Sequence, residues 1–318
     1  SAIYSIDDSA LDGWMAKFLI AGQRAQFSAF NMQNLLKGRN MAVLGGQFSI
    51  FSTRALKQVL KDSHQRTPWV NDSEVEDSLL SLQIKSAGFL TKISATAYAH
   101  VGGMTTLRSL DGQQVKWNYG AIDLMWPGQR GDTRGQPFHP NLRLRWFEHL
   151  SMVLNIFTRL GFLMLLTASL SISAFVFEWW WVLPPLAAEV LNFRVARSMA
   201  FANRRDYVFA LAFWPAEFYM WIRMGHFVRA WVKFFSRTQT DNWAAQAKAE
   251  RGKGSSYLYP FVSLVIFLLA AAAIWLQLPI SLQSDILSVC WPILGVITVL
   301  QTAWMLMKAL RRYRGYKA

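Results

Sequence analysis

The pattern of hydrophobic and polar positions divides the chain near residue 149. Before that point short apolar runs alternate with polar residues, whereas beyond residue 150 long apolar runs dominate. Alternating positions are typical of strands, and apolar positions three and four apart are typical of helices. The pattern therefore predicts a mixed α/β part followed by a part built from long hydrophobic helices.

The first part is predicted to contain short helices and strands. Helices are expected at residues 14–36, 52–61, 78–85 and 105–117, and strands at residues 41–44, 48–51 and 89–99. The helix at 14–36 has two interpretations, an amphipathic helix on a membrane surface or a helix packed on a domain core. Glycine and proline recur between Gly120 and Asn141 and predict a loop, which is long enough to act as a flap.

The second part is predicted to cross a membrane. Residues 150–193 are too long for one span of about 20 residues and fit two tight ones. Residues 258–278 and 286–307 fit one span each. The expected total is four spans, with the tryptophans at 179–181 near a membrane interface.

Basic residues set the expected topology of these spans. They gather at residues 142–145, 194–205, 223–253 and 308–317. Such segments favour the cytoplasmic side, so residues 207–235 are expected to lie along the interface between two helical hairpins. A competing count makes residues 150–177 one span and 207–222 another, which leaves four arginines on the outer side.

Composition supports a membrane protein and argues against other classes. The 318 residues are 53% hydrophobic and carry a formal charge of +14. The aromatic residues lie in the apolar runs and not beside the lysines and arginines, which disfavours nucleic-acid binding. The single cysteine, Cys290, excludes a disulfide framework and a cysteine-based metal site. Residues 1–13 lack the features of a signal peptide and an initiating methionine, so we expect a processed chain or a piece of a longer one.

Two polar motifs in the first part are candidates for chemistry. Glu76 and Asp77 head a predicted helix, where backbone N–H groups favour an ionised carboxylate that can act as a general base. The alternative is a capping box between Ser73 and Glu76. Further on, Gln113, Lys116 and Trp117 share one helix face, where they can meet a phosphate and stack on a sugar. The alternative there is a Trp/Lys pair at a membrane surface.

The order of these motifs resembles one family. Gly45-Gly46-Gln47, Val75-Glu76-Asp77 and Gln113-Gln114-Val115-Lys116-Trp117 precede the apolar spans. This arrangement resembles the membrane-embedded inverting glycosyltransferases, the relatives of cellulose, chitin and hyaluronan synthases. Their signatures are a Thr-Glu-Asp triplet and a Gln-x-x-Arg-Trp motif just before the membrane region. Here Val75 replaces the threonine, and Lys116 replaces the arginine, which removes the two-pronged grip on phosphate but keeps the charge.

The resemblance implies an architecture and a location. Residues 1–119 would be the acceptor-side half of a GT-A α/β glycosyltransferase domain, residues 120–149 a gating-type loop and membrane approach, and residues 150–318 an α-helical transmembrane domain with an interfacial helix near 207–235. The protein would lie in the plasma (inner) membrane, with its catalytic part and C-terminus in the cytoplasm.

The resemblance also implies roles for particular residues. Asp77 would deprotonate the acceptor hydroxyl, with Glu76 in support. Gly45, Gly46 and Gln47 would line the acceptor site. Gln113, Lys116 and Trp117 would hold the donor diphosphate and the acceptor sugar. The donor would be a nucleotide-sugar, and the acceptor a growing polysaccharide or lipid-linked glycan, with export of the product as a possible coupled step.

One departure from the family concerns the donor. The family uses an Asp-x-Asp motif for the nucleotide and its Mg²⁺ or Mn²⁺, and the sequence has none upstream of Trp14. We therefore expect the metal ligands outside this chain, in a second polypeptide or a further segment. The rival function is a non-catalytic transporter or channel component, for which Glu178 and Glu189 near the apolar runs are the candidate residues.

Overall fold

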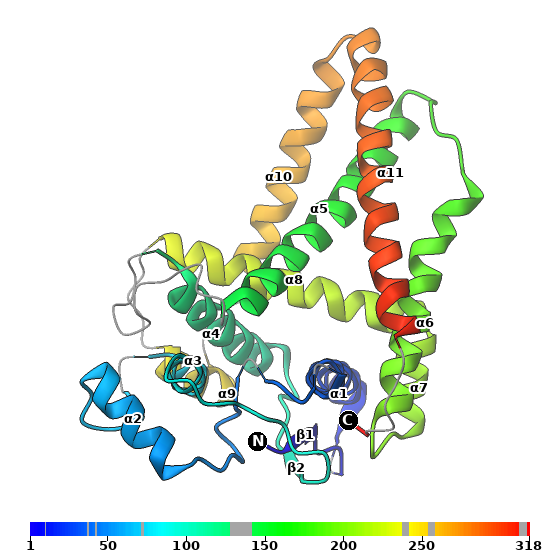
Figure 1. Cartoon of the computed structure of the whole chain (residues 1–318). Coiled ribbons are helices and arrows are strands. Elements are labelled where there is room, and N and C mark those ends of the chain that lie inside the picture. Colours follow the sequence, from blue (N-terminus) through cyan, green and yellow to red (C-terminus); the bar gives the residue numbers. More distant parts are fainter. Residues whose placement is uncertain are drawn as a thin grey trace. The chain divides into compact units, whose positions relative to one another are not determined.

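The computed structural model describes residues 1–9, 11–36, 38–41, 43–70, 73–127, 142–236, 242–253, 258–311 and 317–318. Most of these residues lie in α-helices (Figure 1). The chain forms two compact units. One comprises Ser1–His149, Phe193–Ser255 and Tyr313–Ala318, and the other Leu150–Asn192 and Ser256–Arg312.

The prediction of a GT-A α/β domain is wrong, because the first unit is mainly helical. Its described strands are β1 (Ile3–Ile6) and β2 (Tyr98–Val101), which form a parallel pair. The expected strands at 41–44 and 48–51 do not form; only the end of the segment 89–99 becomes β2. Their backbone makes isolated contacts with neighbouring segments, such as the Met41 N–H with the Thr91 carbonyl at 3.1 Å and the Ala2 N–H with the Phe48 carbonyl at 3.1 Å, and other groups bind side chains. The Leu44 N–H donates to Ser81 Oγ at 2.8 Å, and the Phe48 N–H donates to the Tyr4 hydroxyl at 3.0 Å.

The predicted helices of the first part are confirmed with shifted ends. They are α1 (Gly13–Leu36), α2 (Thr53–Ser63), α3 (Glu76–Ser86) and α4 (Leu107–Met125). In α1, Leu19, Ile20 and Leu35 are almost completely buried, which favours packing on a core over lying on a membrane. Residues 120–125, expected to begin the loop, continue α4. The rest of that expected loop, at residues 128–141, lies outside the described residues.

Helix α4 packs against two helices from a distant part of the sequence, α8 (Phe213–Phe235) and α9 (Asn242–Glu250). Helix α7 (Arg204–Leu211) packs on α1 and α8. One core cluster joins α1, α4, α7 and α8 around Leu19, Leu110 and Tyr219. Asp111 of α4 also forms an ion pair with Arg229 of α8. The helix that carries the second motif is therefore held by residues about a hundred positions away.

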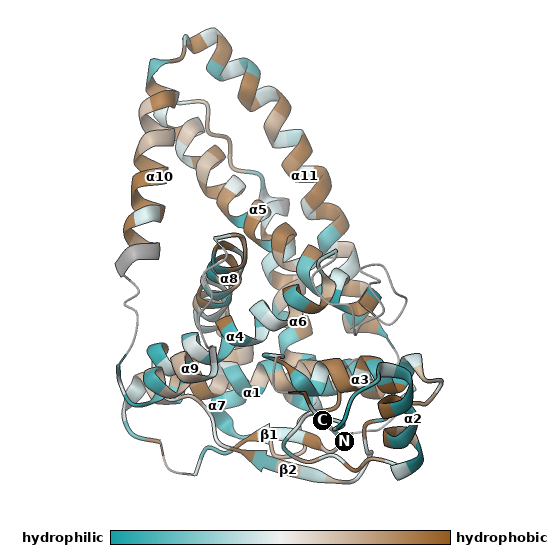
Figure 2. Cartoon of the chain, turned by 90° about the vertical axis from the view of Figure 1, so that its left-hand side faces the viewer, coloured by the Kyte–Doolittle hydropathy of each residue, from teal (hydrophilic) through white to brown (hydrophobic). Residues whose placement is uncertain are grey.

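The second unit holds most of the length of the long apolar helices. They are α5 (Arg143–Ser171), α10 (Leu258–Gln277) and α11 (Ile280–Leu310). The first residues of α5 belong to the other unit. The second unit also contains η2 (Trp179–Val182) and most of α6 (Leu183–Ser198). Figure 2 shows α10 and α11 mainly in the colour of hydrophobic residues.

Two of these helices, α5 and α11, are long and apolar enough to cross a membrane. Only 6% and 17% of their most apolar windows are buried, which differs from the core helix of a soluble protein. A shorter apolar helix covers Phe261–Gln277. The expected four spans are therefore not all found among the described residues, because the segment 150–193 contains one long helix followed by a short one.

Candidate functional site

The first motif stands at the start of α3, as predicted. Val75 is the residue before the first helical turn, and no side chain caps the helix there. The capping box between Ser73 and Glu76 does not form, since Ser73 Oγ instead accepts a hydrogen bond from the Val75 N–H at 3.3 Å. The predicted capping box is therefore absent from the start of α3.

The two oxygens of the Asp77 carboxylate have different surroundings. Oδ1 accepts hydrogen bonds from the Ser78 N–H at 2.6 Å and the Ser78 hydroxyl at 3.3 Å. Oδ2 faces Gly46, where an added Cβ would lie 4.0 Å away. Ser81 fixes this approach, because its hydroxyl donates to the Asp77 carbonyl at 2.6 Å and accepts from the Leu44 N–H at 2.8 Å. One carboxylate oxygen is therefore held while the other borders a residue without a side chain.

Of the three residues predicted at the acceptor site, Gly46 lies nearest to Asp77. At Gly45 a Cβ would lie 2.6 Å from the Tyr4 ring, so only glycine fits there. The Gly45 carbonyl accepts hydrogen bonds from the Tyr4 hydroxyl at 3.0 Å and from Ser49 Oγ at 2.6 Å. Gln47, which follows Gly46 in the chain, is exposed.

Close packing brings α4 against the start of α3. A Cβ at Gly120 would lie 2.6 Å from both methyl carbons of Val75. Val75, Leu79 and Leu124 form a small core cluster, with Trp117 packed against it. The Trp117 ring also meets Phe27 edge to face, with centroids 6.2 Å apart. Trp117 is therefore largely used in packing.

Lys116 is the buried cation of this region. Its side chain is 4% exposed, and its ammonium lies 3.0 Å from the centroid of the Trp243 ring on α9. Burial lowers the pKa of Lys116, and the charges of Glu76, Glu74 and Asp77 oppose that change. The two motifs, forty residues apart in the sequence, thus form one electrostatic cluster.

The same cluster acts on Glu76. Burial raises the pKa of this carboxyl, and the nearby charges of Asp77 and Glu74 raise it further, while Lys116 lowers it. A carboxyl whose pKa is raised holds a proton more readily than a free glutamate side chain does, which suits a supporting role beside the base.

Several residues of the cluster were not predicted from the sequence. Trp243 and Glu250 come from α9, in a segment that the sequence marked only as basic. Arg145 donates to Ser78 Oγ at 3.5 Å and pairs with Glu148 at 2.9 Å. No local pattern connects these positions to α3 or α4, so only the fold reveals them.

The described carboxylates do not fit the Mg²⁺ or Mn²⁺ that the resemblance implies. Among the described residues, no group of three or more His, Cys, Asp or Glu side chains is placed to hold a metal ion. The carboxylates near Lys116 are instead arranged around a cation of the protein itself.

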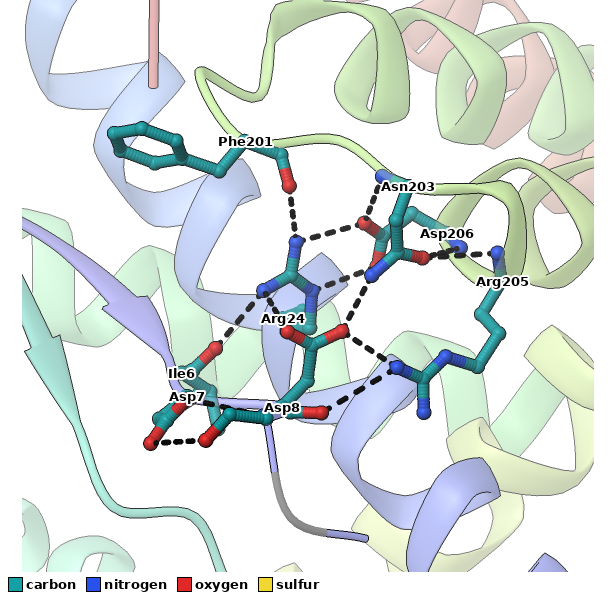
Figure 3. A network of polar contacts seen from close by, with 9 residues as sticks. Ile6, Asp7, Asp8, Arg24, Phe201, Asn203, Arg205 and Asp206 are labelled. Carbon is teal, nitrogen blue, oxygen red and sulfur yellow. Dashed lines mark hydrogen bonds and ion pairs between the residues drawn. The ribbon is translucent and has the colours of Figure 1, made fainter.

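A second buried charge cluster in this unit is fully paired. Arg24 of α1 donates to both carboxylate oxygens of Asp206 at 2.9 and 2.8 Å, and to the carbonyls of Ile6 and Phe201 at 2.9 and 2.6 Å (Figure 3). Asp206 also belongs to the capping box of α7. These contacts join α1, β1 and α7. All three nitrogens of the Arg24 guanidinium donate hydrogen bonds that hold these elements together.

Comparison of the chain with known protein families, with curated proteins and with solved structures finds no match.

Proposed function

We propose that this protein is a membrane glycosyltransferase that moves a sugar, with inversion, from a nucleotide-sugar to a growing polysaccharide or lipid-linked acceptor. The observation that carries the proposal is the packing of α4 on the start of α3, where Gly120 meets Val75, so that the charges of Glu76 and Asp77 act on Lys116. A base and a cation near each other are what the transfer needs, one for the acceptor and one for the leaving diphosphate.

In the proposed reaction, the acceptor hydroxyl attacks the anomeric carbon from the face opposite the diphosphate. The bond between that carbon and the diphosphate oxygen breaks, and its electron pair leaves with the nucleoside diphosphate. The hydroxyl proton passes to Asp77, whose Oδ2 borders Gly46, a residue without a side chain. Lys116 stabilises the negative charge that develops on the leaving group.

Membrane association in this proposal has two supports. The first is the pair of candidate spanning helices, α5 and α11. The second is an apolar stripe on α8, where large side chains 46% to 65% exposed recur at helical spacing. They are Trp214, Phe218, Val228, Val232 and Phe235. A helix with one buried face and one exposed apolar face suits the membrane interface. In this proposal the membrane is the plasma (inner) membrane, and the first unit lies in the cytoplasm.

Substitution of Asp77 tests the proposed chemistry. Asp77→Asn keeps the shape of the side chain but removes its basicity, so sugar transfer in membranes containing the full-length protein should fall about 10²-fold or more. Asp77→Glu keeps a carboxylate but moves it outward by one methylene group, so this variant should retain more transfer than the asparagine variant. Donor binding should survive in both variants.

Asp62→Asn is the matched control, since it removes a carboxylate from α2 that accepts a hydrogen bond from Gln58 at 2.8 Å. Transfer by that variant should stay at the wild-type rate. Wild-type transfer by Asp77→Asn would contradict the assignment of the base.

A further inference from the structure

A chain of hydrogen bonds leads from α8 through α1 to the second motif. The Tyr219 hydroxyl donates to Gln26 Oε1 at 3.1 Å, and Gln26 Nε2 donates to Gln114 Oε1 at 3.2 Å. Gln114 Nε2 then donates to the neighbouring Gln113 Oε1 at 3.4 Å. Three helices thus contribute one line of polar side chains that ends at Gln113.

Every bond in this chain has the same direction. An amide side chain accepts through its oxygen and donates through its nitrogen, so the three hydrogen bonds together define one orientation for each amide. Gln26 and Gln114 each accept on one side and donate on the other. The oxygen of Gln113 is therefore the atom turned toward Gln114, and its NH₂ group is directed elsewhere.

The starting donor is held firmly. A Cβ at Gly22 would lie 2.3 Å from the Tyr219 ring, so the ring packs directly on the α1 backbone one turn before Gln26. Tyr219 is 4% exposed, and burial raises the pKa of its hydroxyl, which stays protonated and able to donate. The residue at 22 must be glycine for this approach.

We propose that Tyr219, Gln26 and Gln114 are positioning residues, which turn the Gln113 NH₂ group toward a phosphoryl oxygen bound near Lys116. Gln113 and Lys116 lie three residues apart on one face of α4, so one anion can meet both. The orientation makes Gln113 a donor, and the ligand atom beside it an acceptor, as in a diphosphate. The inference rests on the proposed function in one respect, namely that the phosphoryl group bound at this face of α4 belongs to the diphosphate of a sugar donor.

Binding of inorganic pyrophosphate to the full-length protein, measured by calorimetry, tests the proposal. Gln113→Met should weaken binding about tenfold, because a hydrogen bond to a charged ligand is lost. Gln26→Met should weaken it about three- to fivefold, and Tyr219→Phe about twofold, since both leave Gln113 in place but free to turn. Gln33→Met, on the same helix two turns further along, should leave binding unchanged.

The double variant Gln26→Met with Gln113→Met decides between positioning and general damage. If Gln26 acts through Gln113, the double variant binds pyrophosphate as Gln113→Met does. Losses that multiply would overturn the proposal, as would wild-type affinity in both Gln26→Met and Tyr219→Phe, or no binding of pyrophosphate by the wild-type protein. If the variants show the expected pattern of pyrophosphate binding but the wild-type protein transfers no sugar, the positioning role is supported and the proposed function is rejected.

Discussion

Two buried cations in the first unit, Arg24 and Lys116, have opposite surroundings. Arg24 makes four hydrogen bonds, two of them to the carboxylate of Asp206. Lys116 is buried to the same degree, yet the contact described for its ammonium is the Trp243 ring, and carboxylates act on it through space. A buried charge paired in this way serves the fold, whereas a buried ammonium that lies on an aromatic ring and is attracted by nearby carboxylates is a candidate for binding an anion.

The largest expected effect comes from breaking the paired cluster. Arg24→Met leaves the buried Asp206 carboxylate without its partner and should lower the free energy of unfolding by about 3–5 kcal/mol. The same change at Lys116 should cost about 1 kcal/mol or less, because the loss of the contact with the Trp243 ring and of the attraction of nearby carboxylates is offset by relief of the burial of an ammonium. Denaturant unfolding of the two variants measures both values.

Arg205→Met is the matched control for this prediction. Arg205 pairs with Asp8 at 2.8 Å but its side chain is 42% exposed, and exposed pairs contribute about 0–1 kcal/mol. Equal losses of stability in Arg24→Met and Lys116→Met would remove the distinction between the two clusters.

A smaller effect is expected from separating α3 and α4. Gly120→Ala places a methyl group 2.6 Å from Val75 and should cost about 1–3 kcal/mol through overpacking. Because the helices move apart, pyrophosphate binding should weaken as well. Unfolding and calorimetry of the same variant give the two values.

Val75→Ala supplies the rescue, since it removes both methyl carbons that the new Cβ would meet. The double variant should regain most of the binding and part of the stability. Failure of the rescue would mean that the contact between Val75 and Gly120 does not hold the two motifs together.

The sequence predicted the helices of the first unit better than its strands. Helices α1 and α4 have apolar positions at helical spacing over ten or more residues, which is a strong local signal. The apolar runs at 41–44 and 48–51 are only four residues long, and such runs do not distinguish a strand from a buried connection. The sheet in the described part of that unit is the β1–β2 pair, and the segments at 41–44 and 48–51 make isolated backbone contacts and bonds to side chains that do not extend into a ladder.

The candidate site was predictable only where its residues lie in local motifs. Glu76, Asp77 and Lys116 were chosen from the sequence, and the structure brings them into one cluster. Trp243 and Tyr219 follow Lys116 by about a hundred residues or more, and each lies in a segment whose basic or aromatic character has several explanations. Contacts of this kind depend on tertiary packing, which periodicity does not contain.

Titration of Lys116 by NMR, assigned with the Lys116→Arg variant, tests most directly whether the two motifs form one site. The negative charge of Glu76 opposes the effect of burial on the Lys116 pKa. Glu76→Gln should therefore lower that pKa further below its already lowered value, and Asp62→Asn on α2 should leave it unchanged. A pKa of Lys116 that does not respond to Glu76→Gln would contradict the account.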